Sequence, residues 1–278
     1  MDDRRLAVNA DDFGFTHDVN AGIVEAHTRG ILTSTTLMAN GAAFADAVRL
    51  AAEVPTLDIG VHLVLVGGVS LLGGGRPLPD TVGAMMRSVV TKDLRVYDEL
   101  RAQMVRIFEA GLRPTHLDTH KHTHLFPPVL DAVARLSEEF GVRWVRRPFD
   151  FPLSGSPSEV PWRKRAVSRM LGSVRGQFHR KLGQHGCRTT DWFAGFQITG
   201  RFHAEDVLHL LENLPVGSTE FMVHPGLCTE ELRAARTRLK ESREAELRAL
   251  TDERVVAAVR RLGIRLCGYG PKLGGARE

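Results

Sequence analysis

The sequence lacks the features that mark several large classes of protein. Its 278 residues contain only three cysteines, which lie far apart and form no C-x-x-C pair: Cys187, Cys228 and Cys267. We read them as buried or incidental thiols in a reducing compartment. No apolar run reaches the roughly 18 residues of a membrane-spanning helix, and the first residues, MDDRRLAVNADDFG, do not resemble a signal peptide. We therefore expect a cytoplasmic protein.

Nucleotide-binding signatures are missing as well. No P-loop and no G-x-G-x-x-G motif precedes a candidate helix, so binding of a nucleotide cofactor is not indicated. With 43% hydrophobic and 25% charged residues, the composition is that of an ordinary globular protein. The length suits one large domain, such as an α/β barrel of roughly 250 residues.

Positive charge is concentrated in one segment. The formal charge of the whole chain is +4, but residues 162–188 carry eight cations and no acidic residue: Arg163, Lys164, Arg165, Arg169, Arg175, Arg180, Lys181 and Arg188. The rest of the chain is therefore net acidic, which argues against nucleic acid as a partner. Apolar residues at helical spacing in this segment predict either an amphipathic helix covering the domain or contact with an anionic membrane or an amphiphilic substrate.

Short apolar segments alternate with helical patterns along the chain. Seven candidate strands are residues 5–10, 33–39, 58–65, 114–120, 142–147, 221–225 and 264–269, and an eighth is 195–199. Helices are expected at 44–53 and 97–110, from Asp18, from Pro127 to about Phe140, and as one long or two shorter helices in 229–262. This alternation predicts a parallel sheet closed into an irregular (β/α) barrel. We expect a single domain over 1–278, with loops inserted at 66–93 and a basic helical insertion at about 150–190.

Polar side chains occur where several of these strands end. Asp11 and Asp12 follow the first strand, His62 lies in the third, and the fifth ends in Arg146. His224 follows a late strand, and parallel α/β folds bind ligands at the carboxyl ends of their strands. Taken singly, each residue has an ordinary reading: the aspartates as a turn or helix cap, His62 as a core histidine, Arg146 as a surface arginine.

The segment THLDTHKHTH is harder to explain as ordinary structure. Its titratable residues all fall on even positions, which places them on one face if the segment is a strand: His116, Asp118, His120, His122 and His124. A solvated strand face would more naturally carry Thr, Lys or Glu. Burying these groups unpaired would cost roughly 1–3 kcal/mol for each neutral group and more for each charge. A divalent cation removes that cost, and mixed imidazole and carboxylate ligands favour Zn²⁺, Co²⁺, Ni²⁺ or Mn²⁺.

Five segments together resemble the YdjC family of carbohydrate deacetylases, which includes chitooligosaccharide deacetylases and hopanoid-biosynthesis-associated deacetylases. They are VNADDFG (8–14), GILTSTTLMANG (30–41), GVHLVL (60–65), PTHLDTHKHTHLFPPV (114–129) and VHPG (223–226). The similarity spans residues 5 to about 269, and no motif covers 150–190. It implies an irregular (β/α) barrel of the NodB-like deacetylase type. It also implies one divalent metal ion and removal of an N-acetyl group from an N-acetylglucosamine-containing saccharide or glycolipid.

The resemblance also assigns roles to residues. It implies metal ligation by Asp12, His62 and His120, with His124 as the runner-up because several members of the histidine row have the same parity. Asp11 matches the general base, His224 the general acid, and Arg146 an arginine that orients the base. A strand segment this short lets one or two members of the row reach a single ion, so the others are expected to orient ligands or contact substrate. That group is His116, Asp118 and His122, and Trp192 is either a sugar-stacking platform or part of the core.

Other functions remain open at this stage. A metal-dependent phosphoesterase or another amidohydrolase would use the same barrel, although such folds usually carry an H-x-H pair on the first strand, where this chain has Asp11 and Asp12. A carbohydrate-binding module with a structural metal would not need both aspartates. Zn²⁺ is favoured by the ligand types, with Mg²⁺ or another divalent ion as the alternative. Peripheral contact with the inner membrane and a homodimer are also left open.

Overall fold

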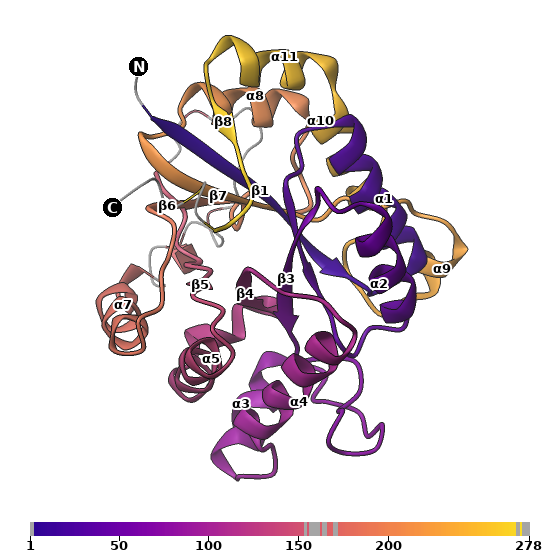
Figure 1. Ribbon diagram of the computed structural model, residues 1–278, viewed down its shortest axis with the longest axis vertical. Helices are drawn as coiled ribbons and strands as arrows, with labels where there is room; N and C mark the ends of the chain where they lie inside the picture. Colours follow the sequence, from indigo (N-terminus) through magenta and orange to yellow (C-terminus); the bar gives the residue numbers. More distant parts are fainter. Residues whose placement is uncertain are drawn as a thin grey trace.

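Eight parallel strands form one curled sheet in the computed structural model of the chain, and helices surround that sheet (Figure 1). The structure describes residues 3–152, 155, 162, 166–168, 172–270 and 273. The strands are β1 (Arg4–Phe13), β2 (Ser34–Leu37), β3 (Asp58–Leu63), β4 (His116–Thr119), β5 (Trp144–Val145), β6 (Trp192–Ala194), β7 (Gly217–Val223) and β8 (Arg265–Leu266).

The order of the strands is β5-β4-β3-β2-β1-β7-β6, and every pair runs parallel. A parallel bridge from Trp144 to Arg188, just before β6, partly closes the gap between β5 and β6. One edge of β1 is shared, because β8 pairs with Arg5 and Leu6 while β2 pairs further along from Asn9. This uneven closure confirms the expected irregular (β/α) barrel.

Strand β1 runs through the middle of the sheet. Its residues from Leu6 to Phe13 are all buried, as expected for a parallel strand covered on both faces. Burying an aliphatic or aromatic side chain of this kind stabilises the fold by about 1.5–3 kcal/mol. The strand therefore carries Asp11 and Asp12 into the interior on a rigid support.

The described helices cover the outside of the sheet (Figure 1). They are α1 (His17–Arg29), α2 (Phe44–Glu53), α3 (Val82–Val90), α4 (Val96–Glu109), α5 (Pro127–Glu139), α7 (Arg175–Gln184), α8 (Ala204–Glu212), α9 (Glu230–Ala234), α10 (Glu241–Thr251) and α11 (Glu253–Arg261). Local signals explain several of their ends. Thr16 caps α1 by accepting a hydrogen bond from the Val19 amide at 3.2 Å, and Pro127 occupies the first turn of α5.

Several predicted elements are wrong in detail. The strand expected at 195–199 is a turn, and β6 lies just before it at Trp192–Ala194. The charged segment 229–262 folds as three helices, and β5 is reduced to two residues. Most important, β4 ends at Thr119, and the chain then turns into a 3₁₀ helix, η1 (His120–Leu125). The alternation of the histidine row therefore stops after Asp118.

The loop expected at 66–93 is partly ordered by one buried carboxylate. Glu99 on α4 accepts hydrogen bonds from the Ser70 hydroxyl at 2.6 Å and from the Leu71 and Leu72 amides at 3.0 and 3.2 Å. The second half of the loop forms the helix α3, which the Gly- and Pro-rich composition did not indicate.

The basic insertion lies only partly within the described residues, and its described part includes α7. Arg163, Lys164, Arg165 and Arg169 fall outside the described residues, so membrane contact stays a prediction, as do the single-domain boundaries, a homodimer and a cytoplasmic location. Within the described ranges, no helix combines the length and apolarity needed to cross a bilayer.

Candidate metal centre and active site

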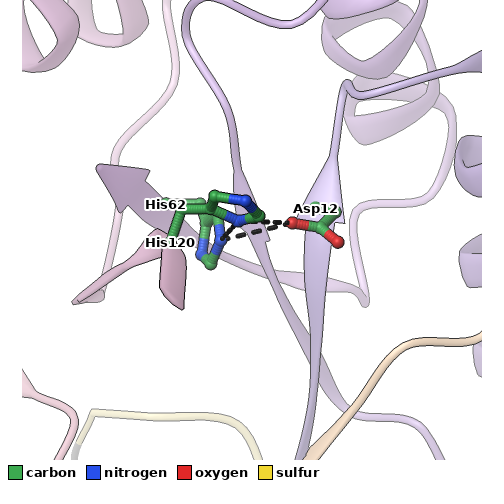
Figure 2. A group of neighbouring side chains, drawn as sticks. All are labelled: Asp12, His62 and His120. Carbon is green, nitrogen blue, oxygen red and sulfur yellow. Dashed lines mark hydrogen bonds and ion pairs between the residues drawn. The ribbon is translucent and has the colours of Figure 1, made fainter. Parts of the chain in front are cut away.

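Three side chains from β1, β3 and the residue after β4 meet at one point (Figure 2). Asp12 lies near the end of β1, His62 lies on β3, and His120 is the first residue after β4. Asp12 Oδ1 is 3.3 Å from His62 Nε2 and 3.2 Å from His120 Nδ1, and the two nitrogens are 3.2 Å apart. His120 keeps 25% of its side-chain surface exposed, so this triangle opens to solvent on that side.

The triangle fits a divalent cation. Ligand atoms held about 2.0–2.1 Å from a tetrahedral ion lie roughly 3.3 Å from one another, close to the three distances observed. Asp12 Oδ1 is buried, and apart from the two ring nitrogens of the triangle it has no hydrogen-bond partner among the described residues. A buried carboxylate oxygen faced only by two imidazoles is unfavourable, and a cation at this point would satisfy it.

The charge balance around the triangle points the same way. Five carboxylates are buried near it against two buried arginines: Asp11, Asp12, Asp118, Glu220 and Glu246 against Arg146 and Arg243. Excess buried negative charge is costly unless a cation or protons neutralise it. Burial raises the pKa of both Glu220 and Glu246 to about 7, so protons supply only part of the compensation.

Asp118 orients His62. Its Oδ1 lies 2.6 Å from His62 Nδ1, so the ring donates there and directs Nε2 toward Asp12. Burial lowers the pKa of His62, but the Asp118 and Asp12 carboxylates outweigh burial and raise it to about 10. The protonated ring thus supplies a positive charge at the point where a cation would lie. A carboxylate behind a ligating histidine is a common feature of metal sites.

Arg146 lies beneath the site and joins three carboxylates. It donates to both oxygens of Asp11, at 2.6 and 2.7 Å, and its Nε donates to Glu220 at 2.6 Å. Its Nη1 also lies 2.7 Å from Asp118 Oδ2. Burial raises the pKa of Asp11, but the guanidinium outweighs burial and holds that pKa well below the usual range. Asp11 is therefore ionised and fixed in one orientation.

His224 lies on the other side of Asp11. Its Nε2 is 3.7 Å from Asp11 Oδ2, and its Nδ1 is 4.0 Å from Glu246 Oε2. Glu246 also accepts the His224 backbone N–H at 2.6 Å, which fixes the loop after β7. Burial lowers the pKa of His224 to about 4, so the ring is neutral at pH 7. The imidazolium expected from the sequence must therefore form during the reaction.

The rest of the histidine row lies away from the triangle. His124 Nδ1 contacts the Thr119 hydroxyl at 2.5 Å, and its Nε2 lies 3.1 Å from the Arg146 carbonyl. His116 is a buried core histidine, bonded to Asn9 at 2.8 Å and stacked on Tyr269 with ring centroids 3.9 Å apart.

His122 is buried among aromatic rings, and Trp192 does not reach the site. The His122 ring lies near Phe193 and Phe196, with centroids 6.1 and 5.7 Å away. Trp192 stands at the start of β6, and its indole N–H donates to the Val216 carbonyl at 3.0 Å, next to the amino end of β7. Parallel strands place that end opposite the triangle, so Trp192 is too far from the triangle to stack on a sugar bound there.

Backbone strain is concentrated at the site. Of four non-glycine residues with positive φ in the described part of the chain, three are Asp12 (71°), Lys121 (55°) and His122 (51°). Such conformations cost about 1–3 kcal/mol each for ordinary residues, and they cluster at functional sites. Here they turn the Asp12 side chain toward the histidines and lift the chain after His120 off the line of β4.

Two functional candidates on α10 were missed by the sequence argument. Arg243 Nη2 donates to Asp12 Oδ2 at 2.5 Å, and Glu246 lies behind His224. A signal was present: both residues fall on the same helical stripe as Leu247 and Leu250, so they are charges on an apolar face.

The curled parallel barrel thus carries, at the carboxyl ends of its strands, an Asp-His-His triangle that could hold a metal ion. The chain belongs to the YdjC-like protein family, whose model matches residues 5–261. The carbohydrate deacetylase of Brevibacillus brevis is 35% identical over 256 residues, covering 89% of this chain and 91% of that protein. The carbohydrate deacetylase of Clostridium beijerinckii is 30% identical over 272 residues, covering 95% and 98%.

A solved structure has the same fold. It is an Enterococcus faecalis protein provisionally described as a cellobiose-phosphate cleavage protein, and it superposes with a TM-score of 0.72 at 25% identity. The match covers 96% of this chain and 98% of that one. The barrel and its strand-end triangle thus lie within a fold shared over nearly the whole length.

Proposed function

We propose that this protein is a metal-dependent deacetylase that removes the N-acetyl group from an N-acetylglucosamine-containing saccharide or glycolipid. The observation that carries the proposal is the triangle of Asp12, His62 and His120, open on one side and flanked by Asp11 and His224. The names of two relatives that share nearly its whole length, both carbohydrate deacetylases, support the substrate class.

Asp12, His62 and His120 are the residues that would hold the metal. Two imidazoles and one carboxylate favour Zn²⁺, with Mg²⁺ or another divalent ion as the alternative. When bound, such an ion polarises an amide carbonyl and makes a water molecule more acidic. Asp118 would keep His62 in the orientation that presents Nε2, as it does in the present structure.

Asp11 and His224 are placed to move the proton that amide hydrolysis requires. Asp11, ionised and held by Arg146, would accept the proton of the attacking water. Because its pKa is held so low, it would not retain that proton. His224 Nε2 lies 3.7 Å away and is neutral, so it can receive the proton and deliver it to the leaving amine nitrogen.

Glu246 lies behind His224 and assists this transfer. Its carboxyl group is 4.0 Å from His224 Nδ1, so its ionised form would stabilise the imidazolium as it forms. Asp11 would therefore remove the proton and His224 would deliver it, and the 3.7 Å between Asp11 Oδ2 and His224 Nε2 supports a direct transfer between them.

A screen of acetyl release tests the function. The substrates are N-acetylglucosamine oligomers, diacetylchitobiose and N-acetylglucosaminyl lipids, analysed by mass spectrometry for the loss of one acetyl group. A phosphorylated sugar, assayed for phosphate release, is the matched alternative substrate. Acetyl loss without phosphate release supports the proposal, and phosphate release without acetyl loss contradicts it.

A further inference from the structure

Arg243 makes the two carboxylate oxygens of Asp12 unequal. Its Nη2 donates to Oδ2 at 2.5 Å, and both side chains are buried, with 1% and 5% of their surface exposed. The other oxygen, Oδ1, faces His62 and His120, and apart from their ring nitrogens it has no hydrogen-bond partner in the described part of the chain. One oxygen is therefore held by the arginine, while the other remains available.

This division decides how Asp12 can bind a cation. A carboxylate can give a metal one oxygen or both. With Oδ2 held by a guanidinium, only Oδ1 can turn to the ion. A catalytic site with three protein ligands needs a further position for water or substrate, and a second Asp12 oxygen would fill that position.

Burying Arg243 at this position costs free energy. Its Nη1 is buried and has no hydrogen-bond partner among the described residues, and its Nε contact with the Leu239 carbonyl is long, at 3.3 Å. Gly226 makes room for its stem, because a Cβ at that position would lie 3.1 Å from Arg243 Cδ. An apolar residue here would continue the stripe of Leu247 and Leu250 without an unmatched donor. A function at Asp12 accounts for the charge.

We infer that Arg243 is a positioning residue that restricts Asp12 to one-oxygen ligation and thereby keeps a coordination position of the metal centre open. The inference rests on the metal binding of the proposed function. In addition, Arg243, which is not itself a ligand, would control how many coordination positions of the metal ion are filled by the protein.

The test compares three single variants by absorption spectroscopy of the Co²⁺-loaded protein. Arg243→Met keeps a long stem without charge or donor, and Arg243→Lys keeps both charge and a donor. Arg248→Met is the control, because Arg248 lies exposed on the same helix. The d–d bands of Co²⁺ weaken as its coordination number rises, so they report the number of ligands directly.

We expect weaker bands in Arg243→Met, because Asp12 can then give both oxygens. Arg243→Lys and Arg248→Met are expected to keep the wild-type spectrum. A folded Arg243→Met with the wild-type spectrum would overturn the inference. If that variant does not fold, Arg243→Gln replaces it with the same expectation, since its amide is too short to reach Oδ2.

A double variant distinguishes this role of Arg243 from a general loss of structure, because the inference predicts that the second substitution raises Co²⁺ affinity. In Asp12→Asn the arginine takes the only side-chain oxygen and leaves the amide NH₂ facing the metal, so Co²⁺ affinity falls sharply. Adding Arg243→Met frees the amide to turn, and we expect affinity roughly tenfold or more above that of Asp12→Asn alone. A double variant that binds no better contradicts the inference. Wild-type protein that binds Co²⁺ no better than Asp12→Asn contradicts the proposed function instead.

Discussion

Arg146 donates one hydrogen bond to each carboxylate oxygen of Asp11, at 2.6 and 2.7 Å, with both side chains buried. The same guanidinium contacts Asp118, which orients His62, and Glu220 below it. One arginine therefore fixes the proposed base and, through Asp118, one of the proposed metal ligands.

Removing this arginine is expected to destabilise the whole fold. Arg146→Met leaves three buried carboxylates without their shared partner, and breaking a buried ion pair costs about 3–5 kcal/mol. Urea unfolding followed by circular dichroism measures the loss. Arg143→Met is the control, because Arg143 lies exposed just before β5 and Arg146 directly follows that strand, and we expect a cost within about 1 kcal/mol. Equal stability of the two variants would contradict the account of Arg146.

Asp11→Asn separates chemistry from metal binding. The amide cannot accept the proton from water, so we expect a fall in kcat of about 10²–10⁴-fold. Metal content should stay at the wild-type level, because Asp11 is not a member of the triangle. Acetate release and bound metal are measured on the same preparation. An Asp11→Asn protein with wild-type turnover would remove Asp11 from the mechanism.

His120 and His124 are the two members of the histidine row proposed for the metal, and a pair of variants distinguishes them. His120→Ala removes one corner of the triangle, so we expect metal affinity to fall by at least about tenfold. His124→Ala removes contacts with Thr119 and the Arg146 carbonyl, so we expect lower stability and retained metal. Titration against a chromophoric chelator gives both affinities. The reverse pattern would assign the ligand to His124.

Asp58 should make stability depend on pH. Burial raises its pKa to about 6, so between about pH 4 and 6 the folded protein binds a proton that the unfolded chain has lost. The stabilising contribution of the protonated form is present at low pH and is lost as the pH rises through 6. Asp58→Asn keeps an acceptor for the Tyr269 amide and a partner for the Thr115 hydroxyl.

We expect this variant to gain stability relative to wild type as the pH rises from 4 to 7, by on the order of 2–3 kcal/mol. Thermal unfolding at both pH values measures the difference. A constant difference across that range would show that Asp58 does not titrate as the structure indicates.

The architecture could be predicted from the sequence because it follows from local rules, whereas the choice of Asp12, His62 and His120 as ligands was implied by the family resemblance. Apolar segments alternating with helices indicate a parallel barrel, and polar residues at successive strand ends must then share one rim. The helix expected at 44–53 matches α2, and that beginning at Pro127 matches α5.

The path of the chain after β4 could not be predicted in the same way. An even spacing of histidines indicates a strand only while the backbone stays extended, and Lys121 and His122 adopt left-handed conformations that tertiary contacts impose. His116 lies before this turn and packs in the core, whereas the turn leaves His120 at the site and directs His124 toward the Arg146 carbonyl.

Arg243 and Glu246 were missed for another reason. A charged sequence such as that of α10 predicts a helix exposed to solvent. In the structure, however, Arg243 and Glu246 are buried on the same face as Leu247 and Leu250. Charges on the apolar stripe of a helix are a signal that sequence reasoning can use, because burying them unpaired would be too costly.

Acetate release with and without metal tests the central claim most directly. The protein is stripped of metal with a chelator, dialysed, and assayed on diacetylchitobiose before and after addition of stoichiometric Zn²⁺, with Asp12→Asn treated in parallel. We predict that stripped wild type releases no acetate, that metal restores release, and that Asp12→Asn stays inactive throughout. Undiminished acetate release by fully stripped wild type would contradict the account.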